Sequence, residues 1–300
     1  MERFNAILGQ DGPKRLLSNF LNTSRIPNTL IFSGPPGVGK LSTALIFASL
    51  LNDEEKKIMR NIHPDVRVLF PEFKGVEPEE IFKMRKKGLY YRLRHKNGNV
   101  LIDTIREIKR LSSLTPFEGK WKIFIIAQSE RMTEEAKNSF LKLLEEPAED
   151  TLFILITTSE ENLSETIRSR GMVIRFRPLK ADEIISIAKE IGVDLKKEEI
   201  FTSQGIEESI FRKNSIDLIE KLNKLFFNTP SYERMSRIEE FNDTEVEDIL
   251  KILDILLFHK MKKIGLKRTL HIIDKIKNAS EYIRSNIKQD RIMRYLFMEV

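Results

Sequence analysis

The sequence predicts an α/β protein in which a parallel sheet is followed by a small helical domain and a C-terminal helical domain. Residues 1–178 alternate short apolar runs with helical patterns, which is typical of crossover units and of a sheet covered on both faces. The strand pattern disappears after Phe176, and Pro178 interrupts the chain. The rest of the sequence is helical in pattern and contains no tandem repeat. We therefore expect domains at residues 1–178, 179–213 and 214–300.

The apolar runs of the first domain have the length of short buried strands. They are Thr29–Ser33, Val66–Phe70, Lys122–Ala127, Leu152–Thr158 and Met172–Phe176. The helical patterns between them are Lys40–Leu51, Leu101–Leu114, Thr133–Glu146 and Asn162–Arg168. Thr133 is followed by two glutamates, which indicates a capped helix start, and Pro147 ends that helix.

The C-terminal part is helical in pattern throughout. Ala181 to Lys213 predicts two or three short helices. The later predictions are Ile219–Leu225, Tyr232–Phe241, Val246–Leu266 and one helix from Arg268 to the end. The side chains that recur at helical spacing and predict a buried stripe are Ile249, Ile252, Leu253, Leu256 and Leu257.

The composition excludes several classes of protein. No apolar run reaches the ~18–20 residues of a membrane-spanning helix, and the N-terminus lacks a signal-peptide pattern. The absence of cysteine excludes disulfides, thiol catalysis and cysteine-based zinc or iron–sulfur sites. The 4 histidines are scattered without the spacing of metal ligands. We expect a cytoplasmic protein, and its high Lys and Glu content is typical of a thermophile.

Two basic zones stand out in a chain of net charge +6. Residues 83–96 contain Lys and Arg without any acid, and residues 259–300 are also strongly basic. Both zones could contact a polyanion or an acidic partner, or they could be solvated helix faces. The first zone contains Tyr90 and Tyr91 within an insertion from Gly75 to Gly98. It could bind single-stranded nucleic acid, but we favour a helical hairpin packed on the domain.

A phosphate-binding loop follows the first predicted strand. The segment Gly34-Pro-Pro-Gly-Val-Gly-Lys40 then opens a helix, so its amides could cradle phosphate while Lys40 reaches the outer phosphates. The candidate residues are Gly34, Gly37, Gly39 and Lys40. The next residue, where a hydroxyl should hold Mg²⁺, is Leu41, and Ser42 is turned ~100° away on the helix.

The acidic pair of an ATPase is also missing. It should end a later apolar strand, but the run Lys122–Ile126 is followed by Ala127 and Gln128. Glu130 comes two residues later, too displaced to substitute in simple register. These losses argue against hydrolysis and favour a loop that is only a strand–helix turn, although phosphate or sulfate could still bind there.

Several motifs together resemble a known family. They are Gly9-Gln10, the loop Gly34–Lys40, His63-Pro-Asp-Val66, Met132-Thr-Glu-Glu135, Leu143-Leu-Glu-Glu-Pro147 and Ser169-Arg-Gly171. In this order they resemble bacterial clamp-loader subunits, which are AAA+ proteins that load the sliding clamp for DNA polymerase III. The chain looks most like the delta-prime kind, whose ATPase motifs are typically eroded. The resemblance covers about residues 1–210.

The resemblance assigns roles to individual residues. Thr157 and Thr158 match the sensor position that would touch a γ-phosphate. Arg170 matches the arginine that, in the family's Ser-Arg-Cys motif, projects into the ATP site of a neighbouring subunit, although Gly171 replaces the cysteine. The second sensor arginine, expected just after Gly205, is replaced by acid. The zinc module of many family members is absent from the short segment 52–61, so no zinc is expected.

The expected function is therefore that of an ATPase-inactive clamp-loader subunit. The resemblance implies a five-stranded AAA+ sheet, a helical lid and a collar that packs against sister subunits of the tau/gamma and delta types through an apolar and basic face. Arg170 would serve a neighbour's ATP, while the sliding clamp and primer–template DNA would be reached through the complex, without a membrane. An active AAA+ motor subunit and a stand-alone nucleic-acid-binding protein remain as alternatives. Leu41, Ala127 and Gln128 speak against the first.

Overall fold

The chain forms two compact units. The computed structural model describes residues 4, 6–73, 75–86, 98–195, 203–241, 244, 246–285 and 287–299. Contacts within the chain divide it into residues 1–211 and 212–300. Helix α10 (Ile206–Asn214) crosses this division, and the segment that we predict to be a lid belongs, up to Phe211, to the first unit.

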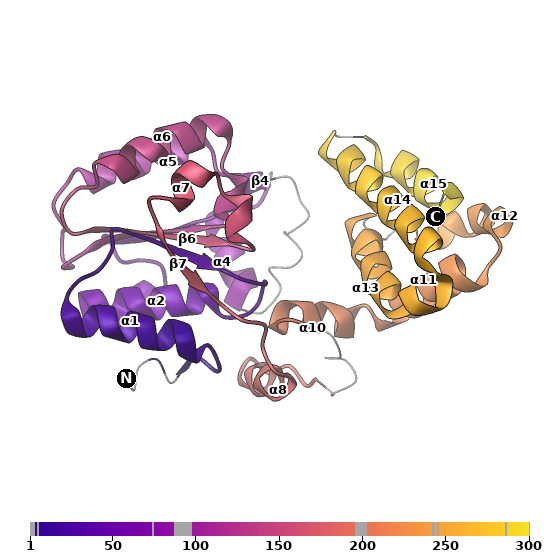
Figure 1. Ribbon diagram of the computed structural model, residues 1–300, viewed down its shortest axis with the longest axis horizontal. Coiled ribbons are helices and arrows are strands. Elements are labelled where there is room, and N and C mark those ends of the chain that lie inside the picture. Colours follow the sequence, from indigo (N-terminus) through magenta and orange to yellow (C-terminus); the bar gives the residue numbers. More distant parts are fainter. Residues whose placement is uncertain are drawn as a thin grey trace. The chain divides into compact units, whose positions relative to one another are not determined.

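The first unit is built on the predicted five-stranded parallel sheet. Its strands are β1 (Thr29–Ser33), β2 (Val66–Leu69), β5 (Lys122–Ala127), β6 (Thr151–Thr157) and β7 (Met172–Arg175). They lie in the order β2-β5-β6-β1-β7, and every pairing is parallel. The five predicted strands are thus confirmed, with ends that differ by at most one residue. Because β1 lies between β6 and β7, the loop that follows it leaves from the interior of the sheet (Figure 1).

Helices cover both faces of this sheet. The helices α1 (Asp11–Thr23) and α2 (Lys40–Asn52) cover one face, while α5 (Ile102–Ser112), α6 (Glu134–Glu145) and α7 (Glu165–Arg168) cover the other (Figure 1). The strand side chains alternate between two cores. Leu30 and Phe32 join the core of α1 and α2, whereas Ile31 joins that of α5, α6 and α7. This alternation buries the strands on both sides.

Some local predictions for the first unit need correction. The helix predicted from Asn162 begins only at Glu165, because residues 160–162 form a 3-10 turn and Leu163 is extended (φ −95°, ψ 148°). The structure adds elements that we did not predict: α1, α3 (Glu55–Met59) and the hairpin of β3 (Glu72–Phe73) with β4 (Gly98–Asn99). The basic insertion contains α4 (Pro78–Lys86), but residues 87–97, including both tyrosines, lie outside the described residues.

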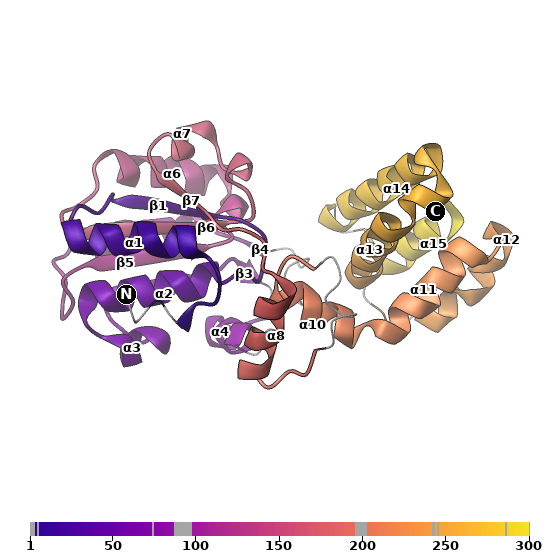
Figure 2. The ribbon, with the colours of Figure 1, turned by 60° about the horizontal axis from the view of Figure 1, so that its bottom comes forward.

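The remaining helices follow in sequence. After α8 (Ala181–Glu190) and α10 come α11 (Ile216–Asn228), α12 (Ser231–Arg234), α13 (Val246–Ile264), α14 (Leu266–Arg284) and α15 (Gln289–Glu299), all labelled in Figure 2. A 3-10 helix, Met235–Phe241, follows α12. The single helix predicted from Arg268 to the end is wrong, because α14 ends at Arg284 and Ile287 N–H closes the turn on the Tyr282 carbonyl. Among the described residues, no helix has the length and apolarity needed to cross a membrane.

Candidate functional site

The loop between β1 and α2 is the segment that the sequence predicts to bind phosphate. Gly37 (φ 71°) and Gly39 (φ 92°) adopt left-handed conformations that favour glycine. Gln10 holds this loop against the chain that leaves β7. Its amide nitrogen donates to the carbonyls of Val38 (3.3 Å) and Arg177 (2.8 Å), and its oxygen accepts the Arg177 N–H (3.0 Å). The Gly9-Gln10 motif therefore connects the loop to the start of the lid.

Four of the predicted site residues line one small pocket: Gly37, Lys40, Thr157 and Thr158. The other two loop glycines, Gly34 and Gly39, are not among its lining residues. The ammonium of Lys40, a buried residue, turns back on its own loop and donates to the carbonyls of Gly34 and Pro35. The cavity volume is about 40 Å³, whereas pockets for drug-sized ligands have roughly 300–1,000 Å³. The pocket beside the loop is therefore small in this structure.

The segment that we predict to be a lid packs directly against this loop. The N–H of Ile206 donates to the Gly37 carbonyl (3.2 Å). A Cβ atom added at Gly205 would lie only 2.3 Å from the Pro36 carbonyl oxygen, so the two backbones are in close contact. Glu207, the acid near the expected second-sensor position, is buried and lines the pocket. Its carboxylate would repel the phosphates that an arginine would attract.

The end of β5 carries no carboxylate at the two positions where the acidic pair was sought. Ala127 and Gln128 line the pocket at the end of β5, where the acidic pair was sought. Leu41 is buried in the core, and Ser42 lines a neighbouring, mainly apolar pocket of about 330 Å³ instead. Within the described ranges, no group of three or more His, Asp or Glu residues could hold a metal ion.

Glu130 is closer to the pocket than its place in the sequence suggested. Gln128 adopts a left-handed conformation (φ 50°), and residues 129–131 form a 3-10 turn that brings Glu130 into the pocket wall. Its Oε1 accepts bonds from the Thr158 N–H (3.4 Å) and the Thr158 hydroxyl (3.2 Å). Glu130 therefore lines the pocket although it does not follow β5 in simple register, and its carboxylate is bound to Thr158.

Arg170 lies outside this pocket, on the exposed turn between α7 and β7. Its Nη1 donates to the Thr166 carbonyl (3.0 Å) and its Nη2 to Glu145 Oε1 (3.0 Å). The side chain is 36% exposed. A Cβ atom added at Gly171 would lie 2.7 Å from Cδ1 of Ile31, so a small residue keeps this turn close to β1. The structure therefore separates Arg170 from the chain's own phosphate loop.

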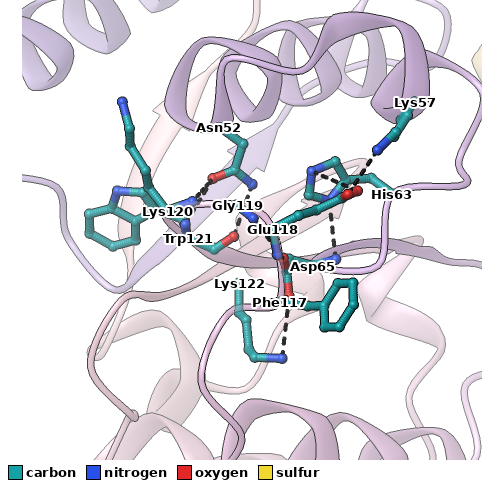
Figure 3. A network of polar contacts seen from close by, with 10 residues as sticks. All are labelled: Asn52, Lys57, His63, Asp65, Phe117, Glu118, Gly119, Lys120, Trp121 and Lys122. Atoms are coloured by element: carbon teal, nitrogen blue, oxygen red, sulfur yellow. Dashed lines mark hydrogen bonds and ion pairs between the residues drawn. The ribbon is translucent and has the colours of Figure 1, made fainter.

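The His63-Pro-Asp motif has a structural role that Figure 3 makes visible. The buried Asp65 carboxylate accepts the backbone N–H groups of Phe117 (2.8 Å), Glu118 (2.8 Å) and Gly119 (2.9 Å). Burial raises the pKa of Asp65, but these three bonds and the nearby Lys122 ammonium (3.5 Å) outweigh it and lower the pKa below 3.8. His63 Nδ1 accepts the Asp65 N–H (3.1 Å), so it is a turn residue.

Comparison with known proteins identifies the family. A family model described as "DNA polymerase III, delta subunit" matches residues 9–180, which is more than half of the chain. The chain belongs to this family. Its fold is the AAA+ arrangement of a five-stranded parallel sheet followed by helices. A crystal structure of a DNA polymerase III gamma subunit-related protein from Thermotoga maritima has this fold, with a TM-score of 0.55, 17% identity and coverage of 94% of this chain and 97% of that one.

Several similar proteins are DNA polymerase III subunits. The chain is 29% identical to DNA polymerase III subunit delta' of Bacillus subtilis over 182 residues (57% of this chain, 48% of the relative). It is 29% identical to subunit tau of the same organism over 190 residues (63% and 32%). It is 26% identical to subunit gamma/tau of Mycoplasma genitalium over 258 residues (84% and 39%). The chain thus spans less than half the length of these relatives.

Proposed function

We propose that this chain is the subunit of a DNA polymerase III clamp loader that completes the ring without hydrolysing ATP and lends Arg170 to a neighbouring ATPase subunit. The observation that carries the proposal is the set of residues that line the phosphate pocket. Lys40 is bonded to its own loop, Glu207 is buried beside it, and Ala127 and Gln128 stand where the carboxylates should be. Arg170 keeps the exposed position that a role toward another subunit requires.

The proposed partners are sister subunits of the tau/gamma and delta types. The sliding clamp and primer–template DNA are reached through the assembled complex, and DNA contact is mainly to the phosphate backbone. Residues 1–178 form the AAA+ domain, 179–213 the lid and 214–300 the collar.

The stripe that the sequence predicts to be buried is indeed buried, so the collar face is sought on another helix. Ile249, Leu253, Leu256 and Leu257 are all buried in the second unit and belong to its own core. The exposed apolar stripe is on α14 instead, at Leu266 (73% exposed), Leu270 (56%) and Ile273 (47%). The spacing places these three side chains on one helix face, and the exposed Lys277, four residues after Ile273, lies on the same face. We assign contact with sister subunits to this stripe.

An ATPase measurement on the isolated chain tests the first half of the proposal. The expected result is no steady hydrolysis with Mg²⁺ and ATP, and no difference between the parent chain and Lys40→Ala. A steady rate that disappears in Lys40→Ala would show a working site and would overturn the proposal.

Substitution of Arg170 in the assembled loader tests the second half. Arginine fingers contribute roughly 10³–10⁵ in rate at the site they serve. Arg170→Ala should therefore remove one site's contribution to clamp- and DNA-stimulated hydrolysis and slow clamp loading, while assembly stays intact. Arg168→Ala, two residues earlier, is the control and should have a smaller effect. Parent rates with Arg170→Ala would refute the trans role.

A further inference from the structure

Two of the motifs that lie outside the phosphate pocket contact each other. Glu145 is the last residue of α6 and belongs to Leu143-Leu-Glu-Glu-Pro147, while Arg170 belongs to Ser169-Arg-Gly171. The motifs lie 25 residues apart in sequence, yet Arg170 Nη2 is 3.0 Å from Glu145 Oε1. One motif therefore supplies a direct partner for the arginine of the other.

We propose that Glu145 is the positioning residue for Arg170. It holds the guanidinium on the surface of the free chain in the orientation in which a neighbouring subunit's nucleotide receives it. This inference rests on the proposed trans role of Arg170 and adds to it the residue that prepares the arginine.

The pair joins two helices that are fixed to the same core. Leu144, next to Glu145, and Ile167, one turn before Arg170, are buried in one hydrophobic cluster. The turn that carries Arg170 is itself closed by backbone bonds, from Ser169 N–H to the Glu165 carbonyl (2.9 Å) and from Arg170 N–H to the Ile167 carbonyl (3.2 Å). The side chains of Glu145 and Arg170 are therefore both attached to backbone that packing and hydrogen bonds hold in place.

The two contacts of the guanidinium restrict its freedom without exhausting its donors. An arginine side chain loses considerable rotamer entropy when it is fixed, so fixing it before assembly lowers the cost of placing it on phosphate. The Thr166 carbonyl and Glu145 each accept one N–H bond, whereas a guanidinium carries five N–H groups. The others can approach phosphate oxygens while the arginine stays anchored, which is the condition for preorganised catalysis.

The test is single-turnover ATP hydrolysis by the assembled loader, bound to clamp and primed DNA. The phase that Arg170→Ala removes reports the site that Arg170 serves. Glu145→Ala should slow this phase by about fivefold, the upper range for a partly exposed ion pair, with the half-saturating ATP concentration unchanged. Glu145→Gln keeps an acceptor oxygen and should stay within about twofold of the parent rate, since amide and carboxylate have nearly the same shape. Glu146→Ala, the adjacent exposed carboxylate, is the matched control and should leave the phase unchanged.

A double substitution separates positioning from a merely structural role. If Glu145 acts through Arg170, the loader with both Arg170→Ala and Glu145→Ala should match Arg170→Ala alone. A double variant slower than Arg170→Ala, or an unchanged phase in Glu145→Ala, would overturn the positioning role. If Arg170→Ala itself removes no phase, the proposed trans function fails instead. Loader assembly, measured by gel filtration for each variant, normalises the rates.

Discussion

At Gly205, a single missing side chain allows the lid to lie on the phosphate loop. A Cβ atom there would come within 2.3 Å of the Pro36 carbonyl oxygen and 2.8 Å of the Gly37 carbonyl carbon, and both obstacles are backbone atoms. Gly205→Ala should therefore force the lid away from the loop and lower the free energy of unfolding by about 2–3 kcal/mol, at the upper range of overpacking. Denaturant unfolding measures this loss.

Gly12→Ala is the control for Gly205→Ala. Gly12 lies in α1, and an added Cβ meets nothing within 4 Å. The substitution should be neutral or stabilise by up to about 1 kcal/mol, because alanine favours a helix. Equal losses in the two variants would show that the contact with Pro36 and Gly37 does not fix the lid.

Asp65 gives stability a dependence on pH. Its Oδ1 accepts the N–H of Phe117, and its Oδ2 accepts those of Glu118 and Gly119. Because the pKa of the folded carboxyl lies below 3.8, its stabilising effect is complete above that pH and is lost as the pH falls toward the folded pKa. Asp65→Asn leaves a single acceptor oxygen for three N–H groups, and it also removes the negative charge beside the buried Lys122. We therefore expect the free energy of unfolding at pH 7 to fall by about 2–4 kcal/mol.

The same variant tests the sign of the pH effect. Unfolding in urea between pH 3 and pH 7 should show a steeper fall below about pH 4 for the parent than for Asp65→Asn, because the variant has no carboxyl to protonate. Parallel curves for the two proteins would show that Asp65 does not have a lowered pKa.

At the scale of whole elements, α14 provides a test of the collar assignment. Leu270 lies in the middle of the exposed stripe, so Leu270→Asp should weaken binding to sister subunits by about tenfold or more, while helicity and thermal stability change little. Met298→Asp on α15 is the control, since Met298 is 61% exposed but lies on another helix. Equal loss in both variants would argue for a broad apolar effect rather than a specific face on α14.

The elements also show why the sequence predicted some features and missed others. Strands such as β1 and β5 are buried along their whole length, so an unbroken apolar run marks their ends. The approach of Glu130 to the pocket could not be extrapolated from strand register, because the left-handed backbone of Gln128 turns the chain. The partnership of Glu145 with Arg170 depends on how α6 and α7 pack, and no periodicity in a single sequence reports such packing.

At the scale of the whole molecule, the two units each have their own buried core. The first unit includes Ile210 and Phe211, which are 2% and 1% exposed and lie within α10. A chain ending at Asn214 therefore keeps this helix intact and should fold, whereas a cut before Ile210 removes buried side chains and should not.

The division into two units predicts how a truncated chain should behave. A chain of residues 1–214 should show a cooperative thermal transition by circular dichroism, because its sheet and both covering layers are complete. It should not join sister subunits in gel filtration at concentrations where the parent chain does, since it lacks the stripe on α14. Because the fragment does not join the loader, the assembly should also lack the hydrolysis phase that depends on Arg170. This holds although the fragment itself contains Arg170. Normal assembly of the truncated chain would place the main subunit contacts in the AAA+ domain and would overturn the collar assignment.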